Sequence, residues 1–140
     1  MSEEQAQQLL YQMQVLESYA SSLDQKEQAI LSILREAMSS IESIRGIIQN
    51  PSAESLIPMG LGTYVKANLQ AGTKILLDVG AGIVVEKDNE SAINYLESKI
   101  KEFQVALNET GAQKHDALNR LDQLKQEMDY MIQASKKSSQ

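Results

Sequence analysis

The stretch LIPMGLGTYVK, residues 56–66, decides the fold, because the same framework returns as LLDVGAGIVVE at residues 76–86. The two copies are offset by twenty residues, and in each a Gly-x-Gly step is followed by a β-branched or aromatic run. Such runs favour strands, and glycine supplies the positive φ angles of tight hairpin turns. The duplication therefore predicts two β-hairpins. The positions that carry this prediction are Leu56, Ile57, Met59, Gly60, Gly62 and Val65 in the first copy and Leu77, Val79, Gly80, Gly82 and Val85 in the second.

A phosphate-binding loop is the alternative interpretation of Gly80-Ala81-Gly82, since an apolar run precedes it. A dinucleotide fingerprint, however, needs a third glycine and a helix N-terminus to receive the phosphate. Val85 stands at the third-glycine position, strand-forming residues follow, and the Gly-Lys-Ser/Thr of a Walker loop is absent. The hairpin interpretation is therefore preferred.

Hairpins this short are not stable alone in water, and their open edges can pair with another chain. We therefore expect residues 51–88 to form a β platform that is completed by other subunits, so that the chain is an obligate oligomer.

Heptad repeats flank the hairpins on both sides and predict coiled-coil helices. The first helix is expected over residues 4–49, and Asn50-Pro51 should end it, because the residue before proline disfavours helical geometry. Its seam positions are Ala6, Leu9, Met13, Leu16, Ala20, Leu23, Glu27, Ile30, Leu34, Ala37, Ile41, Ile44 and Ile48.

The second helix is expected over residues 89–134, with Asp88 or Asn89 as its N-cap and a polar tail at 135–140. Its seam positions are Ile93, Leu96, Ile100, Phe103, Leu107, Thr110, Lys114, Ala117, Leu121, Leu124, Met128 and Met131. Two helices of similar length around a short centre predict an antiparallel pair with the chain ends side by side. The fold class is therefore α+β, in one domain over residues 1–140.

Two charged residues, Glu27 and Lys114, interrupt the seams. Folding the chain about its centre brings them within about one core layer of each other. One hypothesis is that they pair and fix the register of the coil, a use of buried polar groups that is well attested. The alternative is that each is simply tolerated at a polar seam position.

Composition narrows the possible functions. The net charge of −6 does not suit a nucleic-acid-binding surface, and the absence of cysteine excludes disulfides and thiolate chemistry. His115 is the only histidine, and the acidic residues are spaced as on a solvated helix face. We expect no enzyme, no cofactor and no metal site. The polar N-terminus and the short apolar run at 75–85 predict a cytoplasmic protein without a membrane partner.

The segments LIPMGLGTYVKA and KILLDVGAGIVVEK, between two long heptad helices, resemble the alpha class of the prefoldin family over nearly the whole chain. Beta-class subunits have one hairpin, so the duplication favours the alpha class. In its general character the sequence resembles archaeal members more than eukaryotic ones. The resemblance implies a hexamer of two alpha and four beta subunits, built on a double β-barrel with six coiled coils. It also implies an ATP-independent holdase that captures unfolded polypeptides and delivers them to a group II chaperonin.

The chain ends provide a candidate client-binding surface. In an antiparallel pair, residues 5–20 and 121–134 form a tip that has more apolar residues than a narrow seam can bury. Methionine suits such a surface, because its flexible side chain adapts to many partners. The candidate residues are Leu9, Leu10, Tyr11, Met13, Val15, Leu16, Leu124, Met128, Tyr130, Met131 and Ile132.

Two alternatives remain open at this point. The residues off the seam can pack on the flanks of the same coil, since scattered exposed apolar residues are normal. The whole chain can also be a structural coiled-coil spacer or filament subunit that binds no client.

Overall fold

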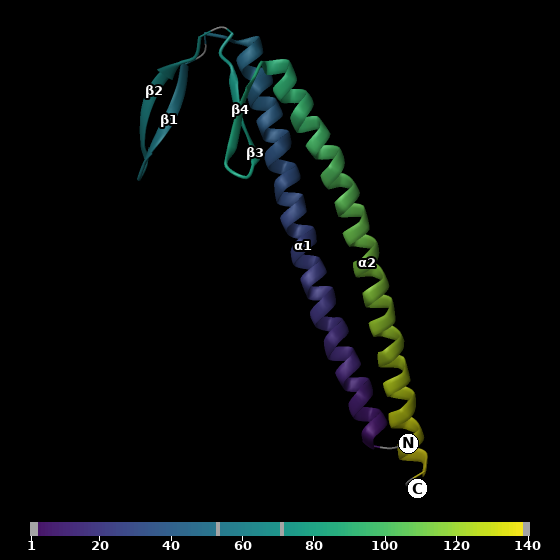
Figure 1. Ribbon diagram of the computed structural model, residues 1–140. Helices are drawn as coiled ribbons and strands as arrows, with labels where there is room; N and C mark the ends of the chain where they lie inside the picture. The colour runs from purple at the N-terminus through teal and green to yellow at the C-terminus, as the bar shows by residue number, and fades with distance from the viewer. Residues whose placement is uncertain (1–2, 53, 71, 139–140) are drawn as a thin grey trace. The chain divides into compact units, whose positions relative to one another are not determined.

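The computed structural model describes residues 3–52, 54–70 and 72–138. Along the chain, four strands lie between two long helices, in the order α1, β1, β2, β3, β4, α2 (Figure 1). The bounds are Glu3–Gln49 for α1, Glu54–Gly60 for β1, Thr63–Asn68 for β2, Ile75–Gly80 for β3, Ile83–Lys87 for β4 and Asn89–Ser138 for α2. The predicted α+β class with two helices and two hairpins is confirmed.

Both helices end or begin where local chemistry requires it. The last hydrogen bond of α1 runs from the Asn50 backbone N–H to the Gly46 carbonyl at 3.0 Å, directly before Pro51. At the start of α2, the Ser91 backbone N–H donates to Asp88 Oδ1 at 2.7 Å, so Asp88 is the N-cap. Asn89 is not, because its Oδ1 is buried without a hydrogen-bond partner.

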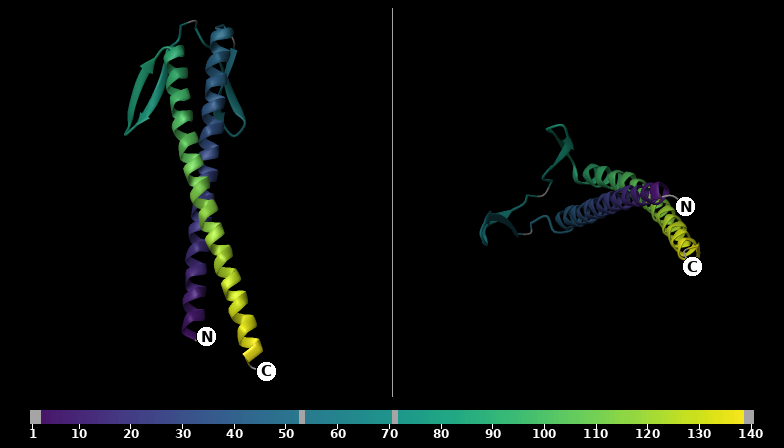
Figure 2. Two further views of the ribbon diagram at one scale, coloured as in Figure 1. Left: turned by 90° about the vertical axis from the view of Figure 1, so that its right-hand side faces the viewer. Right: turned by 90° about the horizontal axis from the view of Figure 1, so that it is seen from below.

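The chain divides into two compact units. The terminal unit contains Met1–Ser32 and Gln104–Gln140, and the hairpin unit contains Ile33–Phe103. In the terminal unit, the first turns of α1 and the last turns of α2 lie at the same end in every view, so the helices run antiparallel there (Figure 2).

The heptad seams are largely protected from solvent. On α1 every described seam position is buried or half-buried except Ile48, which is 49% exposed. The prediction that Ile48 belongs to the buried seam is therefore wrong; this residue lies one position before the end of α1. On α2 no seam position is fully exposed. The helix also continues to Ser138, so residues 135–138 of the expected polar tail are helical, and residues 139–140 lie outside the described part. Gly111 does not interrupt the helix.

The four strands form two separate antiparallel hairpins, β1–β2 and β3–β4. In the first, Ile57 lies opposite Val65, and in the second, Leu77 lies opposite Val85. Each has a register shift directly before its turn, between Pro58 and Gly60 or between Asp78 and Gly80. The duplication in the sequence is thus a duplication of structure.

The turns have the positive φ angles that the Gly-x-Gly steps predicted. In the first turn φ is 109° at Gly60 and 77° at Gly62, and in the second it is 101° at Gly80 and 74° at Gly82. The residue between each pair of glycines also lies in the left-handed region, with φ 48° at Leu61 and 54° at Ala81. Two successive positive φ angles are typical of the type I′ turn that matches the twist of a hairpin.

The second hairpin packs against the helices of its unit through a buried cluster. Leu77 from β3 forms a buried cluster with Ile44 of α1 and Ala92 of α2. Ile75 and Val85 pack against this cluster from the same face of β3–β4. The first hairpin has no buried residue in the described part of the chain.

Candidate functional site

The terminal unit exposes a stripe of apolar side chains on α1. Tyr11, Val15 and Tyr19 are 69%, 49% and 47% exposed. They are spaced four residues apart, which places them on one helix face. Leu10 beside them is 49% exposed. These four side chains therefore stay largely accessible to solvent in the described part of the chain.

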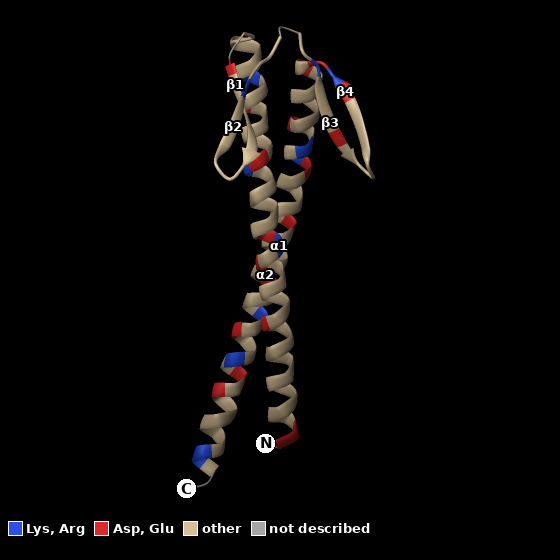
Figure 3. Cartoon of the chain, turned by 90° about the vertical axis from the view of Figure 1, so that its left-hand side faces the viewer, with Lys and Arg blue, Asp and Glu red and all other residues tan. Residues whose placement is uncertain are grey.

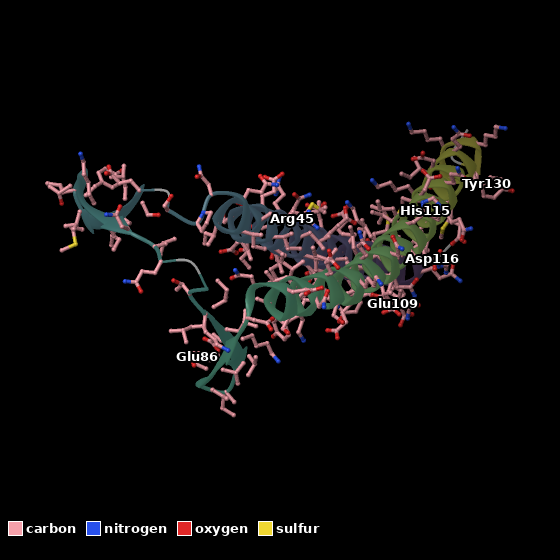
Figure 4. The ribbon with its side chains drawn as sticks, turned by 90° about the horizontal axis from the view of Figure 1, so that it is seen from above. Arg45, Glu86, Glu109, His115, Asp116 and Tyr130 are labelled. Carbon is pink, nitrogen blue, oxygen red and sulfur yellow. The ribbon has the colours of Figure 1, made fainter. Side chains whose placement is uncertain are left out.

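The predicted tip residues fall into two groups. Six of them lie on the seam and are buried or half-buried: Leu9, Met13, Leu16, Leu124, Met128 and Met131. Five lie off the seam and are exposed: Leu10, Tyr11, Val15, Tyr130 and Ile132. Tyr130 points outward from α2 (Figure 4). The off-seam residues are therefore available to a partner, whereas the seam residues serve mainly to hold the helices together.

Two shallow grooves lie in this unit, and sequence reasoning did not find them. One has a volume of about 280 Å³ and lies between Tyr11 and Val15 of α1 and Arg120 and Leu124 of α2. The other, of about 460 Å³, is lined on α2 by residues that include Tyr130 and Met131. The grooves need residues from successive turns or from both helices, so no single motif in the sequence marks them.

A polar layer crosses the terminal unit. Lys114 Nζ lies 2.7 Å from Asp24 Oδ1 and 3.6 Å from Glu27 Oε1. Sequence reasoning expected the Glu27 contact and missed Asp24, although it precedes Glu27 by three residues and so shares its helix face. Thr110, one turn before Lys114, is 1% exposed and donates from Oγ1 to the Ala106 carbonyl at 2.7 Å.

The polar layer affects the ionisation of its lysine. The hydrogen bond to Asp24 raises the pKa of Lys114 above its ordinary value, burial opposes that change, and the charges of Asp24 and Glu27 reinforce it. The lysine is therefore held in its charged form. Whether the layer fixes the register of the helices stays a prediction.

The hairpin unit exposes a second apolar surface, on the residues predicted for oligomerisation. Leu56, Ile57, Met59 and Val65 of β1–β2 are 48–65% exposed. In β3–β4, Val79 is 39% exposed, whereas Leu77 is buried and Val85 half-buried against the helices. The four glycines lie in the turns. The predicted role of these residues in assembly remains a prediction.

Within the described residues, no group of three or more histidine and acidic side chains could hold a metal ion. His115 is exposed on α2 (Figure 4). No described helix is long and apolar enough to cross a membrane.

Comparisons with known proteins agree with this architecture. Residues 16–134 match the family model described as prefoldin subunit. A prefoldin subunit alpha from Nitrosopumilus maritimus is 49% identical over 140 residues, which covers 100% of this chain and 97% of that protein. Another, from Methanospirillum hungatei, is 32% identical over 79% of this chain and 76% of its own length.

Solved structures share the fold at low sequence identity. The crystal structure of the prefoldin beta subunit from Thermococcus strain KS-1 has a TM-score of 0.65 at 19% identity, covering 91% of each chain. The cryo-EM structure of filamentous PFD from Methanocaldococcus jannaschii has a TM-score of 0.57 at 18% identity, covering 90% of this chain and 99% of that one. The chain therefore belongs to the prefoldin family, in the alpha class of these chaperone subunits.

Proposed function

We propose that this chain is a subunit of an ATP-independent holdase, which captures unfolded or nascent polypeptides at the terminal unit. The observation that carries the proposal is the exposed apolar set off the seam, Leu10, Tyr11, Val15, Tyr130 and Ile132. An unfolded chain offers apolar side chains in no fixed order, so its receptor must bury apolar area without a shaped pocket. Shallow, open grooves beside exposed tyrosines suit that task.

Capture requires no nucleotide in this scheme. Binding is driven by removing apolar surface from water, and release follows when the client folds or binds elsewhere. Methionines beside the exposed set, Met13, Met128 and Met131, allow the surface to repack around different side chains. All three are half-buried, so part of each is within reach of a client.

Assembly is the second part of the proposal. We propose that the hairpins join those of four beta subunits and a second alpha subunit in a double β-barrel, from which six coiled coils project. The exposed apolar faces and open edges of β1–β2 support this, because both require cover. The complex would act in the cytoplasm and deliver its clients to a group II chaperonin, as the family resemblance implies.

Aggregation of a denatured enzyme tests client capture directly. The chain is mixed with a one-hairpin beta subunit, and light scattering is followed after dilution of the enzyme from denaturant, with and without ATP. We expect suppression in both cases. The double variant Tyr11→Ser with Ile132→Ser should lose suppression while the complex keeps its size in gel filtration.

A matched variant controls for the loss of any exposed apolar residue. Met38 and Val105 are 50% and 57% exposed but do not belong to the exposed set. Met38→Ser with Val105→Ser should therefore suppress aggregation as the parent does. Equal activity of the parent and the Tyr11→Ser, Ile132→Ser variant would refute client binding at this surface.

The alternative is a structural spacer or filament subunit without client binding. The filamentous assembly from Methanocaldococcus jannaschii has the same fold, but at 18% identity the likeness concerns the fold alone. A complex that forms normally and leaves aggregation of the denatured enzyme unchanged would favour this alternative. Transfer of a fluorescent client to a purified group II chaperonin tests the delivery step separately.

A further inference from the structure

The two grooves of the terminal unit adjoin each other. The first is lined on α2 by Arg120 and Leu124, and the second by residues that include Gln123 and Glu127. Arg120 Nη1 donates to Gln123 Oε1 at 3.3 Å, so a side chain of the first groove contacts a side chain of the second. The grooves therefore lie one after the other along α2, and we call them together the double groove.

Opposite charges stand at the two parts of the double groove. Arg120 is the charged residue among those that line the first part, and Glu127 is the charged residue among those that line the second. Their spacing is close to two helical turns, so they lie on one face of α2, about 10.5 Å apart along its axis. Both are exposed, and neither forms an ion pair with a described residue. Each charge is therefore accessible to a bound molecule.

Apolar side chains lie beside these charges. Tyr11 and Val15 of α1 line the first part, and Tyr130 and Met131 of α2 line the second. Both tyrosines are largely exposed. A molecule that covers the whole double groove must therefore bring apolar groups together with charged ones.

The basic charge in the double groove comes from α2. The first turns of α1 have acidic residues and no lysine or arginine before Lys26, whereas charges of both signs occur along the C-terminal half of α2 (Figure 3). The chain as a whole has a net charge of −6. Long-range attraction therefore favours basic ligands, and the binding of an acidic group depends on a local contact with Arg120. A preference for an acidic group would thus be a specific property of this site.

An extended polypeptide segment, the form that an unfolded client offers, matches the spacing of the two charges. Its side chains alternate between two faces, and each residue advances the chain by about 3.3 Å. Residues on the same face are thus about 7 Å apart at a spacing of two and about 13 Å apart at a spacing of four. Only the spacing of four leaves a further side chain between the charged ones on that face. Arginine and glutamate side chains are long enough to cover the remaining difference.

We propose that the double groove selects client segments by their pattern of charge. The preferred pattern is an acidic residue, an apolar or aromatic residue two positions later and a basic residue four positions later, or the same pattern in reverse order. The acidic residue contacts Arg120, the basic residue contacts Glu127, and the apolar side chain packs on the groove between them. This inference rests on the proposed function, because it names the class of client segment that the terminal unit prefers.

Four capped peptides that differ only at the two flanking positions test the preference. Around a central phenylalanine, the flanks are aspartate and lysine, two aspartates, two lysines, or asparagine and glutamine. The first and last peptides both have no net charge, so the net charge of the protein does not distinguish them. Fluorescence anisotropy with the purified full chain should give a Kd roughly fivefold lower for the aspartate–lysine peptide than for the uncharged peptide at low salt. The difference should shrink at high salt.

Charge reversals in the protein should change which peptide binds best. Arg120→Glu should prefer the peptide with two lysines, and Glu127→Lys should prefer the peptide with two aspartates. The double variant Arg120→Glu with Glu127→Lys should regain the preference for the aspartate–lysine peptide, which then lies in the opposite direction. Circular dichroism checks that every variant keeps its helices.

Matched controls have the same net charges as the single variants. Lys125 and Asp129 line neither part of the double groove, and they are turned from Arg120 by about 140° and 180° around α2. Lys125→Glu and Asp129→Lys should therefore keep the preference of the parent for the aspartate–lysine peptide over the uncharged one.

Two results would overturn this inference alone. One is an equal Kd of the parent for the aspartate–lysine and uncharged peptides, and the other is a change of preference in Lys125→Glu as large as that in Arg120→Glu. In both cases the peptides still bind, so the proposed capture of apolar segments would stand. A parent chain that binds none of the four peptides would contradict the proposed function together with this inference.

Discussion

The two hairpins share one sequence framework and differ in what covers them. Leu77 of β3–β4 is 8% exposed in a cluster with helix residues, whereas Ile57 at the same position of β1–β2 is 49% exposed. The connections explain the difference. Asp88 alone separates β4 from α2, which holds the second hairpin against the helices, whereas longer segments precede β1 and follow β2. One motif can thus be completed within the chain or left for a partner.

The largest expected effect comes from placing a charge at the equivalent position of each hairpin. Leu77→Asp buries a carboxylate in the apolar cluster and should lower the free energy of unfolding by about 3–5 kcal/mol. Ile57→Asp should change it little in the isolated chain, but should weaken assembly. Urea unfolding followed by circular dichroism checks the first, and gel filtration with a beta subunit checks the second. Equal destabilisation by both would remove the distinction between the hairpins.

Turn glycines should show the same contrast at a smaller scale. Gly82→Ala forces a side chain into a backbone with φ 74°, at a cost of about 1–2 kcal/mol, although no neighbouring atom lies within 4 Å. Gly62→Ala, at φ 77°, costs its own hairpin as much, yet should hardly change unfolding of the helices. Gly46→Ala in α1 is the control and should raise the melting temperature. Thermal melts of the three variants decide whether only the second hairpin is coupled to the helices.

The junction after each hairpin gives a pH-dependent test. Hydrogen bonds from Ser91 hold the pKa of Asp88 below its ordinary value of 3.8, so the charged form is favoured in the folded state. That stabilisation is complete above pH 3.8 and is lost as the pH falls through the lowered pKa. Asp88→Ala should therefore lower the melting temperature near neutral pH and have less effect in acid. Asn68→Ala, at the aligned position in the last residue of β2, should show no such pH dependence.

The smallest effect is expected at the middle of each turn. Ala81 has φ 54°, a conformation that asparagine adopts more readily than alanine. Ala81→Asn should stabilise the chain by about 0.5 kcal/mol. Leu61→Asn, at φ 48°, should leave the stability of the isolated chain unchanged, because β1–β2 lies outside the buried cluster. A gain at Leu61 equal to that at Ala81 would show that both hairpins are coupled to the helices.

Much of this molecule follows from local patterns. Heptad spacing predicted both helices, Asn50-Pro51 predicted the end of the first, and the Gly-x-Gly steps predicted both turns with their positive φ angles. These features depend on a residue and its near neighbours, which is the information that periodicity contains.

Features that depend on distant parts of the chain could not be predicted. The two Gly-x-Gly motifs do not by themselves show which hairpin packs on the helices, and in the structure it is β3–β4 that packs on Ile44 and Ala92. Asp24 lies closer to Lys114 than Glu27 does, although only Glu27 occupies a seam position. The heptad position of a residue therefore does not determine which carboxylate its lysine partner contacts. At the candidate site, the heptad positions separated buried from exposed residues. One groove, however, needs residues of both helices, and the other needs residues from successive turns of α2.

The pairing of Asp24 with Lys114 spans 90 residues, and this has a consequence for synthesis on the ribosome. At about 5–20 residues per second, α1 must wait roughly 5–20 s before the part of α2 that covers it has been translated. During that interval the apolar seam of α1 is exposed, and the nascent chain is itself the kind of molecule that a holdase binds. Newly made copies would therefore compete with other clients for complexes that are already assembled.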